Sequence, residues 1–163
     1  MDPLTVIPGF AVFPVEHTCD GADRSPAITV LGGRAPYLAL VMEDLDAPWG
    51  AYTHWILWNV PAAERLPGGL PAEGTLSEPA GAMQGTNDFG TVGYRGPCPQ
   101  RGESHRFLFR VYGLGRPLDL PPGADRVAFG RAIGDAIREY GEAVAAYGRA
   151  AETVPEEEDA CRS

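Results

Sequence analysis

The stretch DLDAPWGAYTHW places two carboxylates, a proline-containing turn and a histidine close together in the chain. Asp44 and Asp46 precede the turn and His54 follows it, and the flanking runs LALVME and ILWNV are apolar and β-prone. Acids and an imidazole at the ends of buried strands could form a catalytic acid–base pair, a metal site, a pocket for an anion or zwitterion, or a structural hydrogen-bond network. A second histidine, His105, follows the Gly- and Pro-rich stretch GYRGPCPQRGES.

Catalytic and metal sites lack their usual sequence signatures. Ser104 precedes His105, but the chain has no GxSxG nucleophile motif, so covalent catalysis is not expected. The acids and histidines named above are acceptable ligands for zinc or manganese, but they do not follow a fixed spacing such as HExxH. The sequence therefore predicts neither a metal nor another cofactor.

The Gly-rich stretch before His105 indicates an anion site of a different kind. It lacks the lysine of a P-loop, and no helix follows it. It can bring backbone N–H groups to the strand end beside His105, which together form a concave set of donors for an anionic oxygen. The remaining histidine, His17, lies among turn residues and is interpreted as a surface or loop residue.

The elements that must position these residues are short strands. Four runs are predicted as strands, at residues 27–31, 37–43, 53–60 and 105–114. The second run is almost continuously apolar, as in a strand covered on both faces, whereas the fourth alternates with the period of a half-buried strand. The segments between them are too rich in Pro and Gly for helix, and they are typical of the crossover connections of a Greek-key sandwich.

The pattern changes after residue 124. Residues 125–150 carry apolar side chains at spacings of two to four, which predicts an amphipathic helix lying across the sandwich, with a break near Gly141. The predicted fold is all-β, a Greek-key sandwich of two antiparallel sheets with a C-terminal amphipathic helix. Residues 1–150 are predicted to form one domain, and residues 151–163 an acidic, disordered tail.

Composition excludes several partners. The net charge of −9 disfavours nucleic acid and anionic membrane surfaces. No apolar run approaches the roughly 18 residues needed to span a bilayer, and the N-terminus has no signal-peptide core, so we expect a cytoplasmic protein without integral membrane association. The cysteines, Cys19, Cys98 and Cys161, are odd in number and form no CxxC pair, which predicts reduced thiols.

Three segments, at residues 18–30, 43–61 and 87–114, resemble the phosphatidylethanolamine-binding protein family, whose prokaryotic branch is often labelled Raf-kinase-inhibitor-like. The resemblance implies the same all-β sandwich and a small pocket that binds anions such as phosphate, acetate or a phospholipid head group. It places these residues at the pocket: Asp44, Asp46, Ala47, Pro48, His54, Gly96, Pro97, Pro99, His105 and Phe107.

The chain departs from the family pattern at three places. Leu45 stands where proline is usual, Phe107 stands where many members have tyrosine, and the segment between Pro48 and His54 is short. The short segment argues against the signalling roles of eukaryotic members. Because family members often have a cis peptide bond at the turn, the Ala47–Pro48 bond is predicted to be cis.

The predicted function is binding of a small anionic or zwitterionic ligand, such as phosphate or a phosphorylethanolamine-like group, without catalysis. In this interpretation the histidines and the Gly-Pro loop donate N–H groups to the anion, while Asp44 orients a histidine, raises its pKa or meets an ammonium group. One alternative is a protein-interaction module that inhibits a serine protease or a kinase. Another is a hydrolase or metal site that uses Asp44, His54 and His105. A homodimer is left open.

Overall fold

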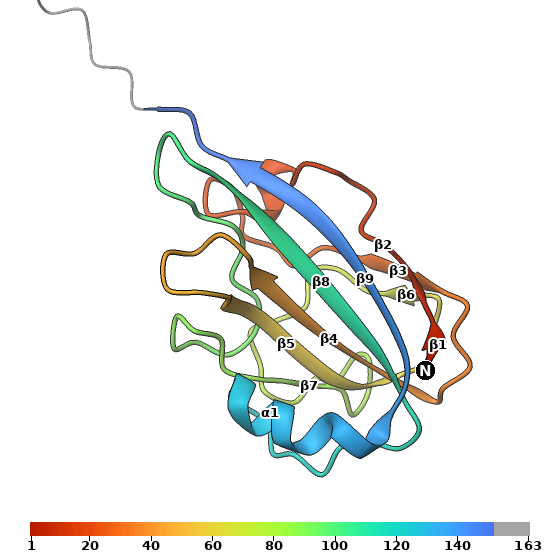
Figure 1. Ribbon diagram of the computed structural model, residues 1–163. Coiled ribbons are helices and arrows are strands. Elements are labelled where there is room, and N and C mark those ends of the chain that lie inside the picture. Colours follow the sequence, from red (N-terminus) through yellow and green to blue (C-terminus); the bar gives the residue numbers. More distant parts are fainter. Residues whose placement is uncertain (152–163) are drawn as a thin grey trace, which may run out of the picture.

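Two sheets of unequal size pack against each other in the computed structural model, which describes residues 1–151 (Figure 1). The large sheet has the strand order β1–β9–β8–β4–β5–β7, and the small sheet has the order β2–β3–β6. All pairings are antiparallel except that of β1 with β9. The strands are β1 Asp2–Pro3, β2 Thr5–Ile7, β3 Ile28–Leu31, β4 Tyr37–Asp44, β5 Tyr52–Pro61, β6 Arg65–Leu66, β7 Met83–Gln84, β8 Ser104–Leu114 and β9 Ile137–Gly148.

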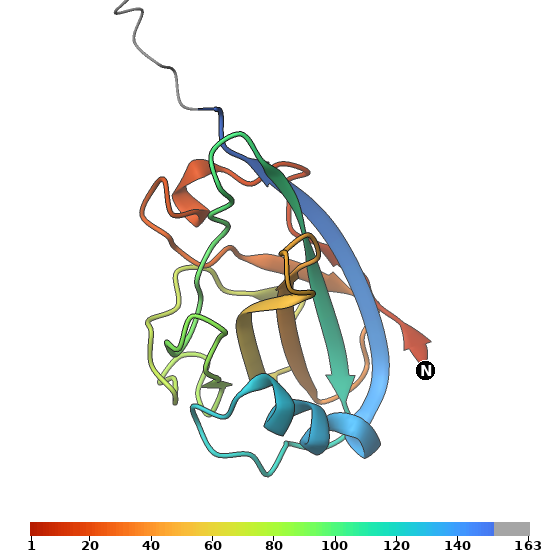
Figure 2. The same cartoon turned by 60° about the vertical axis from the view of Figure 1, so that its left-hand side comes forward.

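The four strands predicted from the sequence are confirmed as β3, β4, β5 and β8, with small shifts at their ends. The strands β4 and β5 lie inside the large sheet, as predicted, with β8 and β7 as their outer neighbours. The end of β4 and the beginnings of β5 and β8 therefore meet at one end of the molecule, and helix α1, Arg126–Ile133, lies at the other end (Figures 1 and 2).

The almost continuous apolar run of β4 is explained by two cores, one on each face of the large sheet. Leu40 and Met42 pack into the core between the sheets, where the small sheet contributes Ile28. The alternate residue Val41 packs on the opposite face, against a second core that includes Phe129 of α1. Because successive side chains of a strand point to opposite faces, both sets are buried and neither face needs polar residues.

The predicted C-terminal helix is present but much shorter than residues 125–150. Asp125 caps α1 by accepting a hydrogen bond from the backbone N–H of Ala128 at 2.9 Å, and a 3₁₀ turn, Gly134–Ala136, follows the helix. A second 3₁₀ turn covers Val15–His17 near the N-terminus. The remainder of the expected helix is the long strand β9, which pairs with β8 along its length. The helical prediction was therefore wrong beyond the first two turns.

Small and polar residues at the buried positions of β9 explain the error. Glu139 and Ala145 are buried, whereas the apolar Val144 is 51% exposed. Glu139 is satisfied by the backbone N–H groups of Arg34 and Ala35, at 2.6 and 3.0 Å. The burial has the period of a strand, but its buried face carries few large apolar side chains, so a pattern of hydrophobicity could not reveal it.

Cysteine pairing also differs from the prediction. Cys19 and Cys98 form a disulfide bond with their Cα atoms 5.4 Å apart, although they are separated by 79 residues in the sequence. Three hydrogen bonds hold the two loops together: Cys19 N–H to the carbonyl of Pro97, Tyr94 O–H to the carbonyl of His17, and Gly96 N–H to Asp23. Closure of a loop of this length contributes about 4.5 kcal/mol to the free energy of unfolding in the chain-entropy model.

The other sequence predictions have mixed outcomes. The cis peptide bond among the described residues is Glu78–Pro79, so the prediction of a cis bond at Ala47–Pro48 was wrong. Cys161 and nearly all of the predicted tail lie outside the described residues. Within residues 1–151, no helix is long and apolar enough to cross a membrane.

A substitution at Gly141 of β9 tests how closely the N-terminal segment packs on this strand. A Cβ atom at Gly141 would lie 2.3 Å from the carbonyl oxygen of Leu4, whereas one at Gly134 would meet nothing within 4 Å. We expect Gly141→Ala to lower the free energy of unfolding by about 2 kcal/mol because the backbone must shift. Gly134→Ala is the control and should be neutral or slightly stabilising. Urea denaturation measures both, and equal stability of the two variants would contradict this packing.

Candidate functional site

A cavity of about 230 Å³ opens at the end of the molecule where β4 ends and where β5 and β8 begin. Its lining combines histidines, carboxylates, aromatic rings and Pro99. The lining residues are Asp44, Ala47, Pro48, Trp49, Tyr52, His54, Phe89, Cys98, Pro99, Gln100, Glu103 and His105. Six of the ten residues that the sequence placed at the pocket are among them: Asp44, Ala47, Pro48, His54, Pro99 and His105.

The centre of the cavity is a buried ion pair between two strands. Asp44 is the last residue of β4 and accepts a hydrogen bond from Nδ1 of His105 at 2.7 Å. Both residues are buried, and Nε2 of His105 also contacts Oε2 of Glu103 at 2.9 Å. Burial by itself lowers the pKa of His105, but the hydrogen bonds to Asp44 and Glu103 outweigh it and raise the pKa above its usual value. Because carboxylates accept hydrogen bonds and each ring nitrogen contacts one, this geometry favours the imidazolium form of His105.

His54 is in a different state from His105. Its Nδ1 donates a hydrogen bond to the carbonyl of Arg95 at 2.6 Å, which fixes the proton on Nδ1 because a carbonyl can only accept. Burial lowers the pKa of His54, despite the opposing effects of that carbonyl and of Asp44. The ring is therefore neutral near pH 7, and with its proton on Nδ1 the other nitrogen, Nε2, is an acceptor. The sequence had predicted a donor here.

Aromatic rings hold His54 in place. Phe89 and Phe107 lie edge-on to its ring, with centroid distances of 5.0 and 5.3 Å, and Tyr52 lies 6.1 Å away. Phe107 is fully buried and does not line the cavity, so it packs beneath the histidines. Phe89 is in turn covered by the guanidinium of Arg95, 4.8 Å from the centroid of the phenyl ring.

Asp46 does not line the cavity either. Its carboxylate accepts hydrogen bonds from the backbone N–H of Arg106 at 2.8 Å and from the guanidinium of the same residue at 2.8 and 3.0 Å. These bonds lower the pKa of Asp46 to about 2. The backbone N–H of Asp46 is donated to Asp44 at 2.8 Å, so Asp46 joins the turn to β8 and helps to fix Asp44.

Part of the Gly-Pro loop faces away from the cavity, which the sequence did not predict. The N–H of Gly96, expected to face an anion, is donated to Asp23 at 2.9 Å, and a Cβ at this position would lie 2.0 Å from the carbonyl oxygen of His17. The carbonyl of Pro97 accepts from Cys19. These two residues therefore face the N-terminal loop, while Cys98 and Pro99 form the wall of the cavity.

Five lining residues were missed by sequence reasoning: Trp49, Tyr52, Phe89, Gln100 and Glu103. Cys98 lies within the Gly-Pro loop that was expected to form one wall. A signal existed for Glu103, because it lies two residues before His105 and alternate residues of a strand share a face. No local signal marked Phe89, which reaches His54 from a turn far along the chain. Within residues 1–151, no cluster of three or more His, Cys, Asp or Glu side chains could hold a metal ion.

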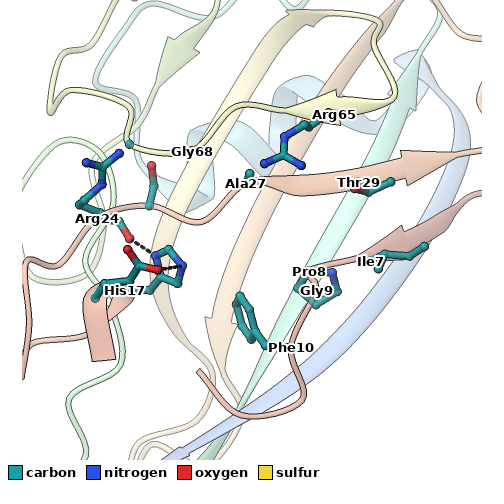
Figure 3. Close-up of a pocket in the computed structure, with 13 residues that line it drawn as sticks. Ile7, Pro8, Gly9, Phe10, His17, Arg24, Ala27, Thr29, Arg65 and Gly68 are labelled. Carbon is teal, nitrogen blue, oxygen red and sulfur yellow. Dashed lines mark hydrogen bonds and ion pairs between the residues drawn. The ribbon is translucent and has the colours of Figure 1, made fainter. Parts of the chain in front are cut away.

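A larger hollow of about 510 Å³ lies elsewhere, on the outer side of the small sheet (Figure 3). Arg24 and Arg65 stand at its rim and Phe10 lies below them, but both arginines are exposed. The ring of His17 is committed to the carbonyl of Arg24, at 2.8 Å, and to the carboxylate of Glu16, at 3.6 Å. The hollow contains no buried charged pair, so the smaller cavity is the stronger candidate for ligand binding.

Comparison with known proteins agrees with this fold. The family model described as phosphatidylethanolamine-binding protein matches residues 5–148. The chain therefore belongs to the phosphatidylethanolamine-binding protein family.

Relatives occur in archaea and bacteria. A UPF0098 protein of Pyrococcus horikoshii is 41% identical over 139 residues, which are 83% of this chain and 70% of that protein. A Mycobacterium tuberculosis protein named putative lipoprotein LppC is 40% identical over 83% of this chain and 67% of its own length.

Two crystal structures have the same fold. A putative phosphatidylethanolamine-binding protein homologue from Chlamydia trachomatis superposes with a TM-score of 0.78 at 25% identity, over 91% of this chain and 99% of that one. Escherichia coli YbcL, described as a member of the mammalian family, also gives 0.78, at 28% identity over 90% and 97%.

The two pocket histidines should titrate on opposite sides of the usual histidine pKa, about 6.5. The stabilisation from His105 is complete below the unfolded pKa and is lost as the pH rises through its higher folded pKa. We expect Asp44→Asn to lower the pKa of His105 and to reduce this loss, because the largest favourable partner of the imidazolium becomes neutral. NMR titration of the ring resonances measures both values. A His105 pKa at or below that of His54 in the unmodified protein would contradict the geometry.

Proposed function

We propose that this chain binds a small phosphate-bearing ligand that also carries a cationic group, of the phosphorylethanolamine class, and does not catalyse its conversion. The observation that carries the proposal is the imidazolium of His105 held between Asp44 and Glu103 beside a neutral His54. The cavity of about 230 Å³ is smaller than the usual 300–1,000 Å³ of pockets for drug-sized ligands, so it suits a head group more than a whole lipid.

Each charged group in the cavity has a complementary group on such a ligand. The imidazolium of His105 attracts the phosphate, and the acceptor Nε2 of His54 suits a protonated phosphate oxygen or an ammonium. The carboxylates of Asp44 and Glu103 disfavour a bare dianion and favour a ligand with a positive group. The geometry gives less support to the hydrolase alternative, because Asp44 bonds to His105 and not to His54, and no serine, threonine or free thiol lines the cavity.

A second candidate is the inhibition of a serine protease or kinase through the mouth of the cavity. Trp49 is 95% exposed on the turn after β4, and Phe89 is 39% exposed nearby in the lining. Exposed aromatic residues are typical of interface anchors. If a protein partner engages this mouth, phosphorylethanolamine should reduce its binding, whereas a partner on another surface should be unaffected.

We keep the cytoplasm as the proposed location. This proposal rests on the sequence, which has neither a membrane-spanning apolar run nor a signal-peptide core at its N-terminus. The Cys19–Cys98 bond weighs towards an oxidising compartment, because disulfides are rare in the cytosol of mesophiles, although intracellular proteins of hyperthermophiles carry them. The name putative lipoprotein belongs to the mycobacterial relative.

Histidine substitutions test the proposed site. We expect His105→Ala to weaken phosphorylethanolamine binding tenfold or more, since a charge-assisted hydrogen bond contributes about 1.5–3 kcal/mol. His54→Ala should have a smaller effect because its ring is neutral. The affinity of the wild type for phosphorylethanolamine should fall as the pH rises through the pKa of His105. Titration calorimetry measures the affinities.

His17→Ala is the matched control, because this histidine lies in the other hollow. It should bind like the wild type, and a thermal melt should show that each variant is folded. If His17→Ala lost binding and His105→Ala retained it, the ligand would bind in the hollow of Figure 3 and the proposed site would be wrong.

A further inference from the structure

We propose that Glu103 is the specificity-determining residue of this cavity. Its carboxylate accepts a hydrogen bond from the Nε2–H of His105, and a bound phosphate must displace this carboxylate. The proposal rests on the proposed function above. Its geometric basis is the 2.9 Å contact between Oε2 of Glu103 and Nε2 of His105, opposite the 2.7 Å contact with Asp44. With both ring nitrogens engaged, His105 has no N–H left for an incoming anion.

The Glu103 side chain is placed to leave without disturbing the fold. Its side chain is 48% exposed, whereas those of Asp44 and His105 are 9% and 10% exposed. The backbone around it is held to the residue that follows β9: Arg149 N–H donates to the carbonyl of Glu103 at 3.0 Å, and Gly102 N–H donates to the carbonyl of Arg149 at 2.7 Å. Displacement therefore requires only rotation of an exposed side chain.

The other acids near the cavity cannot take this role. Asp44 is buried and accepts from both His105 and the backbone N–H of Asp46. The carboxylate of Asp46 is engaged by Arg106 and does not line the cavity. Among the lining residues, Glu103 is thus the carboxylate that can exchange with a ligand.

The exchange gives the cavity a preference between ligands. Inorganic phosphate must break the Glu103–His105 ion pair and then lie beside a released carboxylate, which repels it. Phosphorylethanolamine meets the same cost, but its ammonium group can pair with the released Glu103. The difference in affinity between the two ligands therefore depends on the charge of Glu103.

The experiment compares inorganic phosphate and phosphorylethanolamine by titration calorimetry on the wild type, Glu103→Gln and Glu64→Gln. Glu64 is an exposed acid outside the cavity, so its variant removes the same charge at a distance. We expect Glu103→Gln to bind inorganic phosphate about tenfold more tightly, the effect of weakening one charge-assisted hydrogen bond in the free protein. The affinity of Glu103→Gln for phosphorylethanolamine should increase less, so its preference for this ligand over inorganic phosphate should be smaller than that of the wild type. Glu64→Gln should bind both ligands with the affinities of the wild type.

The outcomes separate this inference from the proposed function. If the wild type binds phosphorylethanolamine and Glu103→Gln leaves the affinity ratio of the two ligands unchanged, the role of Glu103 is wrong and the proposed function stands. If no protein binds either ligand, both are wrong. An independent readout is the NMR titration of His105, whose pKa should fall in Glu103→Gln; an unchanged pKa would overturn the contact itself.

Discussion

The hydrogen bond between Asp44 and His105 joins the end of β4 to the start of β8, and the candidate site depends on it. It compensates the burial of two ionisable groups, which would be costly for either group alone. It also fixes the imidazole so that Nε2 is presented to the exchangeable carboxylate of Glu103. The turn that follows β4 is attached to the same strand by Asp46 and Arg106, so the acid and the imidazolium are held by neighbouring contacts.

The large sheet provides the rigid base for this pair because both of its faces are covered. The small sheet covers one face and α1 covers the other, so β4 and β5 cannot shift their register without exposing one set of apolar side chains. Functional side chains held at the ends of such strands keep their geometry better than side chains on free loops. The loop walls are in turn tied down by the Cys19–Cys98 bond and by hydrogen bonds to the N-terminal loop.

The mixture of charges distinguishes the site from a simple anion trap. In the proposed function, a cationic His105 attracts a phosphate, while two carboxylates and a neutral His54 limit how much negative charge the cavity accepts. The histidines differ because burial lowers the pKa of His54, whose carbonyl partner offsets this only in part, whereas carboxylates on both ring nitrogens raise the pKa of His105. This arrangement is the reason for proposing a ligand with both signs of charge.

The sequence by itself determined the central strands, the all-β class and the family, because local alternation and motifs carry that information. It also identified Asp44, His54 and His105 as lining residues. Only the tertiary structure showed that β9 is a strand, since its buried face includes Glu139, Gly141 and Ala145, whose burial depends on partners far away in the chain. The disulfide, the commitment of Gly96 to the N-terminal loop and the neutral state of His54 were likewise decided there. Each depends on contacts between residues distant in sequence, and no local pattern encodes such contacts.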